Sequence, residues 1–156
     1  MKFIADGMLG SLVRWLRMMG HDVEYLHGLD DDKLLAIAKN EERILLTRDL
    51  ELYKRSISKG IDAFYVEGKT EAERLAAVSE RFRIELDIDL KTSRCPKCNT
   101  AIQTVPKMHI VDRVQKNTYL HYDEFWECPH CKTVYWQGAH WPKIRDTLEE
   151  AKAHKK

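Results

Sequence analysis

Four cysteines, the only ones in the chain, form two Cys-x-x-Cys pairs that are separated by 29 residues. Cys95 and Cys98 lie in CPKC, and Cys128 and Cys131 lie in CPHC. In an intracellular chain this duplicated spacing favours tetrahedral zinc binding by four thiolates over disulfides. A redox motif would need a single Cys-x-x-Cys at a strand-to-helix turn, which the duplicated pattern does not offer. We therefore predict one structural zinc ion per chain.

The segments around these cysteines are rich in β-branched and aromatic residues, as in MHIVDRV, TYLHYDEFWE and KTVYWQG. Such runs are typical of the short strands of a zinc ribbon. Nearby histidines are alternative ligands, but four thiolates already complete the zinc shell and leave no open catalytic position; these histidines are His109, His121, His130 and His140. We predict a β-rich zinc ribbon with a C-terminal helix over residues 91–156.

The first ninety residues alternate apolar runs with segments of helical periodicity. KFIA precedes LGSLVRWLRMMG, DVEYL precedes DDDKLLAIAKNEE, RILLT precedes LELYKRSISKG, and IDAFYVE precedes TEAERLAAVSERF. In the last segment Thr70 and Glu73 match a capping box. This order predicts an α/β domain over residues 1–90, with a parallel sheet flanked by helices. The alternating segment IELDIDLK is either an edge strand or an extended connection, and it places the domain boundary near Leu90.

Charge is divided unequally between the two halves. Residues 1–90 contain 14 basic and 18 acidic side chains, whereas residues 91–156 contain 12 basic and 7 acidic ones. A basic half beside an acidic half favours an anionic partner, although a chance imbalance is the alternative. No apolar run reaches the ~20 residues that a membrane span needs, and MKFIADGMLG does not resemble a signal peptide. The sequence thus predicts a cytoplasmic protein without a membrane partner.

Acidic residues follow three of the predicted strands. Asp6 follows the first, Asp30 and Asp31 follow the second, and Asp49 follows the third. Carboxyl ends of parallel strands meet at one edge of a sheet, where ligands bind. Carboxylates gathered there would repel one another without a cation, and their oxygens suit Mg²⁺ or Mn²⁺. Glu67, at the end of the fourth strand, is a candidate fourth acid.

Each of these acids also has a simpler interpretation. Asp30, Asp31 and Asp49 precede or begin predicted helices, so each could act only as a helix cap. Asp22 and Asp62 precede their strands and should lie at the opposite edge of the sheet. A metal site therefore depends on the conjunction of three acidic positions, not on any single one.

Basic side chains provide candidate contacts for an anionic polymer. Arg14 and Arg17 share the helix face opposite the apolar stripe, and Arg48 adjoins Asp49. Arginines beside metal-binding acids suit phosphodiester chemistry, although a solvated helix face is the commoner role. The ribbon adds Lys97, Lys107, Arg113, Lys116 and Lys132. Its aromatic residues could stack bases, but in so small a unit they more often form the core; they are Trp126, Tyr135, Trp136 and Trp141.

The order of these motifs resembles the Mut-seven-C ribonuclease domain family over essentially the whole chain. The resemblance is carried by FIAD, LGSLVRWLRMMGHDV, DDDKLLAIAKNEERILLTRD, RCPKCN and ECPHCKTVYWQGAHW. It implies a PIN-like nuclease fold joined to a zinc ribbon, and a metal-dependent ribonuclease whose acids match Asp6, Asp31 and Asp49. Asp31 is preferred to Asp30 because PIN-like relatives place the acid three residues before an apolar helix position and seven before a small one. The fourth acid of other PIN nucleases has no clear match.

The preferred interpretation is an RNA endonuclease that uses Mg²⁺ or Mn²⁺, with Asp6, Asp31 and Asp49 as metal ligands. The zinc ribbon, through Lys107, Arg113 and Lys116, would hold the RNA backbone together with the arginines of the first domain. The alternative is a non-catalytic RNA-binding adaptor that keeps the fold. A flavodoxin-like phosphotransfer domain is a third possibility, but Gly7 and Met8 after Asp6 disfavour the Asp-x-Asp phosphatases.

Overall fold

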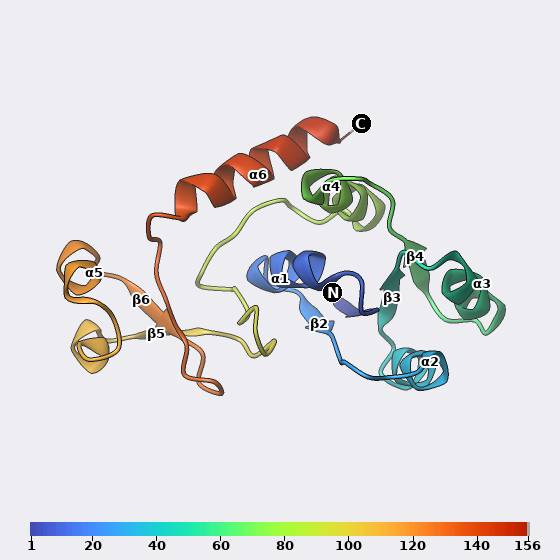
Figure 1. Cartoon of the computed structure of the whole chain (residues 1–156), viewed down its shortest axis with the longest axis horizontal. Coiled ribbons are helices and arrows are strands. Elements are labelled where there is room, and N and C mark those ends of the chain that lie inside the picture. Colours follow the sequence, from blue (N-terminus) through green and yellow to red (C-terminus); the bar gives the residue numbers. More distant parts are fainter. Residues whose placement is uncertain (156) are drawn as a thin grey trace.

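The computed structural model, which describes residues 1–155, has a four-stranded parallel sheet and a separate three-stranded antiparallel sheet (Figure 1). The parallel sheet has the order β2-β1-β3-β4 and consists of β1 (Lys2–Ala5), β2 (Asp22–Glu24), β3 (Ile44–Thr47) and β4 (Ala63–Tyr65). Each strand is followed by one helix; these are α1 (Gly10–Met18), α2 (Asp31–Asn40), α3 (Leu50–Ser58) and α4 (Glu71–Phe82). The predicted α/β class, with a parallel sheet flanked by helices and followed by a small β-rich unit, is confirmed.

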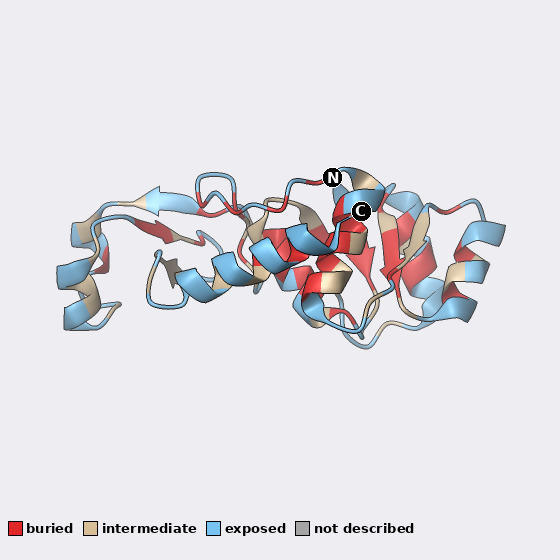
Figure 2. Ribbon diagram, turned by 90° about the horizontal axis from the view of Figure 1, so that it is seen from above, coloured by how far each residue is buried: buried red, intermediate tan, exposed pale blue. Residues whose placement is uncertain are grey.

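Alternate residues of each strand pack against opposite layers of helices, as the two-residue period of a strand requires. Phe3 and Ala5 of β1 join the cluster formed with α1 and α4. Ile4 of β1 and Leu45 of β3 join the cluster formed with α2 and α3. Figure 2 shows the buried residues concentrated on the strands and on the inward sides of these helices. The sheet is therefore covered on both faces.

The chain reverses its direction across the sheet between β1 and β3. From β1 it passes through α1 to β2 on one side, and it then returns through α2 to β3 on the other side. In open parallel sheets such a reversal leaves a crevice at the carboxyl ends of the two strands, where ligands bind. The residues after β1 and β3 consequently occupy the most favourable position for a site.

Residues 84–90 form an extended connection and not an edge strand, which decides between the two interpretations of IELDIDLK. The apolar residues Ile84, Leu86, Ile88 and Leu90 are buried, and the acids between them are exposed. The alternation thus reflects packing against the body of the protein without pairing to a strand.

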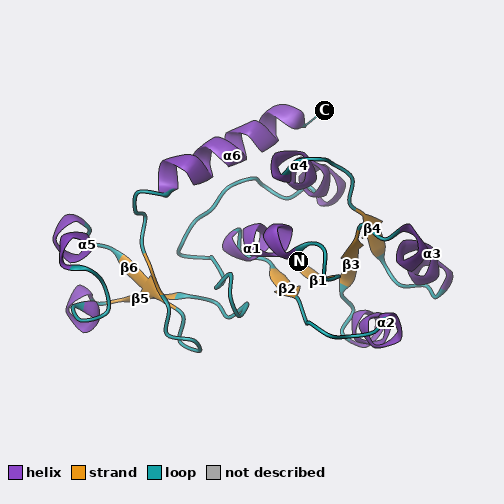
Figure 3. Ribbon diagram, viewed as in Figure 1, coloured by secondary structure: helices purple, strands orange, loops and turns teal. Residues whose placement is uncertain are grey.

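In the C-terminal unit, two of the segments predicted as strands are wholly or partly helical (Figure 3). Its antiparallel sheet has the order β5-β6-β7 and consists of β5 (Gln103–Val105), β6 (Phe125–Glu127) and β7 (Val134–Tyr135). The prediction that MHIVDRV is a strand is wrong, because its first residues belong to a 3-10 helix (Lys107–Ile110). TYLHYDEFWE begins within α5 (Lys116–His121) and reaches β6 only at its end. Ile110 is buried but Val111 is exposed. Because β propensity depends on packing against neighbouring strands, the β-branched residues of MHIVDRV do not by themselves make it a strand.

The C-terminal helix α6 (Trp141–His154) packs on α4 of the first domain (Figure 1). Leu148 and Ala151 of α6 are buried in the same cluster as the α1–α4 face of the sheet, together with Cys95 and Cys128. One hydrophobic core joins the two parts because α6 returns to cover α4. The hydrophobic core therefore continues across the predicted boundary near Leu90.

We predict that Leu148→Ala lowers the free energy of unfolding by about 2–5 kcal/mol, because it leaves a cavity between α6 and α4. Leu120→Ala is the matched control, since Leu120 is 62% exposed, and it should cost less than about 0.5 kcal/mol. The measurement is chemical unfolding followed by circular dichroism. Equal, small effects of both variants would contradict the shared core.

Candidate functional site

The four cysteine sulfurs gather at the junction of the two sheets. Within residues 1–155 they form the one group of three or more potential ligands whose atoms all lie within 4.8 Å of one another. Sγ of Cys95 lies 3.6 Å from Sγ of Cys131, and Sγ of Cys98 lies 3.3 Å from Sγ of Cys128. Tetrahedral zinc with Zn–S bonds of ~2.3 Å requires sulfurs about 3.8 Å apart, whereas a disulfide requires ~2.05 Å. The donor set and its spacing fit a zinc ion, so the four cysteines could hold one.

The two cysteine pairs form turns of the same geometry. The backbone N–H of Asn99 donates to the carbonyl of Cys95 at 2.8 Å, and that of Lys132 donates to the carbonyl of Cys128 at 2.9 Å. Asn99 and Lys132 both have a positive φ, of 71° and 66°. Each turn directs its two sulfurs into the shared cluster.

The thiols differ in how readily they lose a proton. A hydrogen bond from the Thr133 hydroxyl lowers the pKa of the Cys131 thiol to about 6. Burial raises the pKa of the Cys128 thiol to about 12. Because zinc binds thiolates, binding at neutral pH must displace the proton of Cys128, which makes affinity depend on pH.

Asn99, in the first cysteine turn, pairs with the outermost strand of the parallel sheet. Its side-chain oxygen accepts from the backbone N–H of Val23 in β2 at 3.0 Å, and its amide nitrogen donates to Asp22 at 2.7 Å. Asp22 also forms an ion pair of 2.8 Å with the buried Arg43. Burial alone would raise the pKa of Asp22, but the hydrogen bonds from Arg43 and Asn99 lower it. Asp22 is thus part of the contact that fixes the cysteine turn to the sheet, at the edge opposite the carboxyl ends, as predicted.

Arg17 forms the second connection between the cysteine turn and the first domain. Its guanidinium donates to the carbonyl of Val23 through Nε and Nη2, at 3.0 and 2.8 Å, and to the carbonyl of Pro96 through Nη1 at 2.9 Å. The prediction that Arg17 lies on the solvent face of its helix beside Arg14 is wrong, because Arg17 is only 6% exposed. Burial lowers the pKa of Arg17, yet arginine remains charged. The residue is used to join the two halves and is not available to a ligand.

The other basic residues predicted to contact RNA differ in their exposure and in whether they already bind acceptors within the protein. Arg14 is exposed on α1, but Arg48 is partly buried and donates to the carbonyls of Val66 and Gly68 at 2.6 and 3.1 Å. In the ribbon, Lys107 pairs with Asp123 at 3.2 Å, Arg113 pairs with Glu127, and Lys116 is exposed at the start of α5.

The carboxyl ends of β1 and β3 bring Asp6 and Asp49 into one hydrogen-bond network. The hydroxyl of Thr47 donates to the carboxylate of Asp6 and accepts from the backbone N–H of Asp49 at 2.9 Å. Thr47 is completely buried at the end of β3. Asp6 also accepts from the backbone N–H of Met8, and Asp49 caps α3 by accepting from Glu51 and Leu52. The Thr47 hydroxyl therefore links two of the three predicted acids at the carboxyl ends of β1 and β3.

Asp31 does not complete a compact cluster with Asp6 and Asp49. It lies on the first turn of α2, is exposed, and pairs with Arg55 of α3 at 3.4 Å. Asp30 caps α2 through the backbone N–H of Lys33, as the simpler interpretation predicted. The loop between β2 and α2 places Asp31 beside α3. The strand order alone does not predict this position, because it does not determine the path of the loop.

Glu67 is exposed, whereas a neighbouring acid that the sequence did not single out has defined partners. Glu71, in the first turn of α4, accepts hydrogen bonds from the Ser11 hydroxyl and the Trp15 indole of α1. The sequence signal for Glu71 was only its position after the capping residue Thr70, which is common in helices that bind nothing.

We predict that the purified protein contains about one zinc ion per chain, because four sulfurs complete a tetrahedral shell. Cys98→Ser should abolish zinc binding. His130→Ala, which changes a residue between Cys128 and Cys131, should retain it. Elemental analysis of the three proteins tests this, and a zinc-free wild type would contradict it.

We also predict that Arg17→Ala lowers the free energy of unfolding by about 3 kcal/mol, because it removes the donors to the buried carbonyl of Val23 and the partly buried carbonyl of Pro96. Arg14→Ala, three residues earlier on the exposed face of the same helix, should change it by less than about 0.5 kcal/mol. Chemical unfolding of the zinc-loaded proteins measures both. If Arg14→Ala proves the more damaging, the assignment of Arg17 to the junction is wrong.

None of the helices in the described residues has the length and apolarity needed to cross a bilayer. No curated protein and no solved structure matches the chain. The model of one family, described as the Mut7-C RNAse domain, matches residues 1–148. The match includes the parallel sheet, the Asp6–Thr47–Asp49 network and all four cysteines. The chain therefore belongs to the Mut7-C RNAse domain family, whose name indicates a ribonuclease-related role and an interaction with RNA.

Proposed function

We propose that this protein is a metal-dependent ribonuclease, and specifically an endonuclease, that acts at the carboxyl edge of β1 and β3. The observation that carries the proposal is the Asp6–Thr47–Asp49 network. It lies where parallel α/β sheets bind ligands, and it occurs in a chain of an RNAse domain family.

The side chains at this edge suit a divalent cation. Asp6 and Asp49 offer hard carboxylate oxygens of the type that Mg²⁺ and Mn²⁺ prefer. The buried Thr47 hydroxyl holds the carboxylate of Asp6 in place, which reduces the entropy lost on binding a ligand. Asp31 would join them only by leaving Arg55. When bound, the cation would supply a water nucleophile of lowered pKa and would neutralise charge on the phosphate.

The RNA backbone would be held by exposed basic side chains. Arg14 and Lys116 are exposed, and Arg48, Lys107 and Arg113 could contribute by exchanging their present acceptors for phosphate oxygens. Arg17 is excluded from this set because its donors are used within the protein.

A non-catalytic RNA-binding adaptor is the second candidate, and a specific observation favours it. Asp31 is paired with Arg55 and does not gather with Asp6 and Asp49, so the acids do not form a ready metal site. Under this alternative the acids act as helix caps, as Asp49 does for α3, and the protein binds RNA without cleaving it.

We predict that Asp6→Asn, Asp31→Asn and Asp49→Asn each abolish Mn²⁺-dependent cleavage of RNA and leave thermal stability nearly unchanged. Asparagine can still cap α3 at position 49, so loss of activity would report the lost charge. Asp62→Asn is the control, because Asp62 is exposed and precedes β4 at the opposite edge. Cleavage of end-labelled cellular RNA with and without Mn²⁺ is the measurement. RNA binding without any cleavage by the wild type would favour the adaptor.

A further inference from the structure

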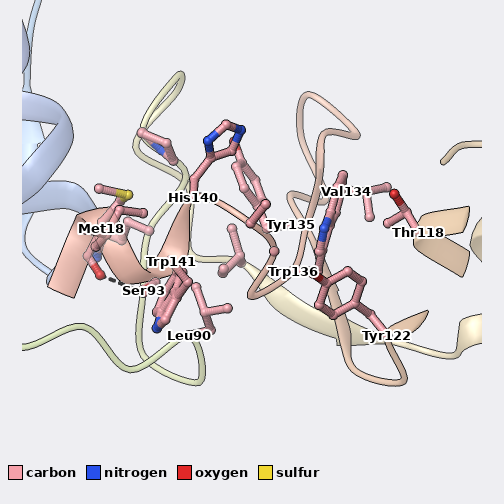
Figure 4. Close-up of a pocket in the computed structure, with 16 residues that line it drawn as sticks. Met18, Leu90, Ser93, Thr118, Tyr122, Val134, Tyr135, Trp136, His140 and Trp141 are labelled. Carbon is pink, nitrogen blue, oxygen red and sulfur yellow. Dashed lines mark hydrogen bonds between the residues drawn. The ribbon is translucent and has the colours of Figure 1, made fainter. Parts of the chain in front are cut away.

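An apolar cavity of about 390 Å³ lies between the ribbon, the connection 84–90 and the start of α6 (Figure 4). This volume falls in the ~300–1,000 Å³ range of small-ligand pockets. Neither Asp6 nor Asp49 lines the cavity, so it is separate from the acidic edge. The cavity is therefore a second concave feature that the cleavage chemistry does not use.

Aromatic side chains form opposite walls of this cavity. In Figure 4 Trp141 lies with Leu90 on one side, and Trp136 lies with Tyr122 on the other. These walls come from three segments: the connection 84–90, the residue after α5, and the stretch between β7 and the start of α6. Flat rings on both sides of a gap suit a flat aromatic ligand better than an aliphatic chain, because both faces of the ligand can stack.

Trp136 and Trp141 are held in place by the same short turn. The backbone N–H of Trp141 donates to the carbonyl of Gly138 at 3.0 Å. A Cβ atom at position 138 would lie 2.5 Å from the indole nitrogen of Trp136, so the turn admits that ring only because Gly138 has no side chain. Phe125 supports the Trp136 ring from β6, with ring centroids 6.1 Å apart. The aromatic walls are thus preformed, which limits the entropy lost when a ligand binds.

The polar groups of the cavity complement an anionic ligand. Arg94 and His140 line the cavity, and none of its lining residues is acidic. The hydroxyls of Thr118 and Tyr122 can exchange hydrogen bonds with the edge of a heterocycle. A flat ring with polar edges, attached to a negative charge, describes a nucleotide.

We propose that this cavity binds one unpaired nucleobase of a single-stranded RNA, stacked between Trp141 and the Trp136–Tyr122 wall. The inference rests on the RNA-binding role proposed above and identifies the form of RNA that the protein takes. Bases in a duplex stay stacked on their neighbours, whereas unpaired bases can turn out and stack on aromatic side chains. The same sequence presented as a duplex should therefore bind less tightly.

The test compares ring-preserving and ring-removing substitutions in the zinc-loaded full chain. The probe is a short oligouridylate that carries one 4-thiouridine, and binding is measured without added Mg²⁺ or Mn²⁺ so that the RNA stays intact. Trp136→Leu and Trp141→Leu keep an apolar side chain but remove the flat ring, and each should weaken binding about tenfold. Trp136→Phe and Trp141→Phe should stay within about threefold of wild type. Gly138→Ala should weaken binding about as much as Trp136→Leu. Both tryptophans remain in this variant, but the added Cβ atom would displace the Trp136 ring.

Photocrosslinking of the wild type locates the base directly and does not depend on how any variant folds. Crosslinks on Tyr122, Trp136 or Trp141 would support the proposal. Crosslinks elsewhere, with leucine variants that bind like wild type, would overturn it without contradicting the proposed ribonuclease function. Leucine variants that change only the oligomeric state would also overturn it, because the cavity would then be a protein contact. Absence of any RNA binding would overturn both this inference and the proposed function.

Discussion

The contact between the first cysteine turn and the edge of β2 is the constraint on which the rest of the structure depends. The Asn99 side chain accepts from the backbone N–H of Val23, as a neighbouring strand would, and Arg17 joins the carbonyls of Val23 and Pro96. An open strand edge is normally exposed to unwanted pairing, and here the cysteine turn covers part of it. Because Cys95 and Cys98 flank Pro96, a bound zinc ion would stabilise the sheet as well as the ribbon.

This contact also explains why the two halves cannot be treated as independent modules. The connection 84–90 buries its apolar side chains against the first domain, and α6 returns from the ribbon to cover α4. Between these two attachments lies the aromatic cavity, whose walls include Leu90 from the connection and Trp141 from α6. The cavity exists only when both halves are in place.

The positions of the acids at the carboxyl edge of the sheet depend on strand pairing and on one loop. Asp6 and Asp49 are brought together by the pairing of β1 with β3, and the buried Thr47 links them. Asp31 belongs to a helix whose position depends on the loop after β2, and it lies beside Arg55 in the α3 layer. Two acids are therefore part of the rigid sheet, while the third would reach them only through a change of its ion pair.

Patterns with short periods and fixed spacings could be interpreted from the sequence alone. The alternation of apolar runs and helical segments determined the parallel α/β class, and the capping box of Thr70 and Glu73 marked the start of α4. The duplicated Cys-x-x-Cys pattern predicted the sulfur cluster, because local turn geometry directs both sulfurs of a pair to one side. Only the tertiary structure decided that Arg17 is buried, that α6 covers α4, and that Asp31 lies apart from Asp6 and Asp49. These outcomes depend on contacts between residues far apart in the chain, for which helical periodicity and motif spacing carry no signal.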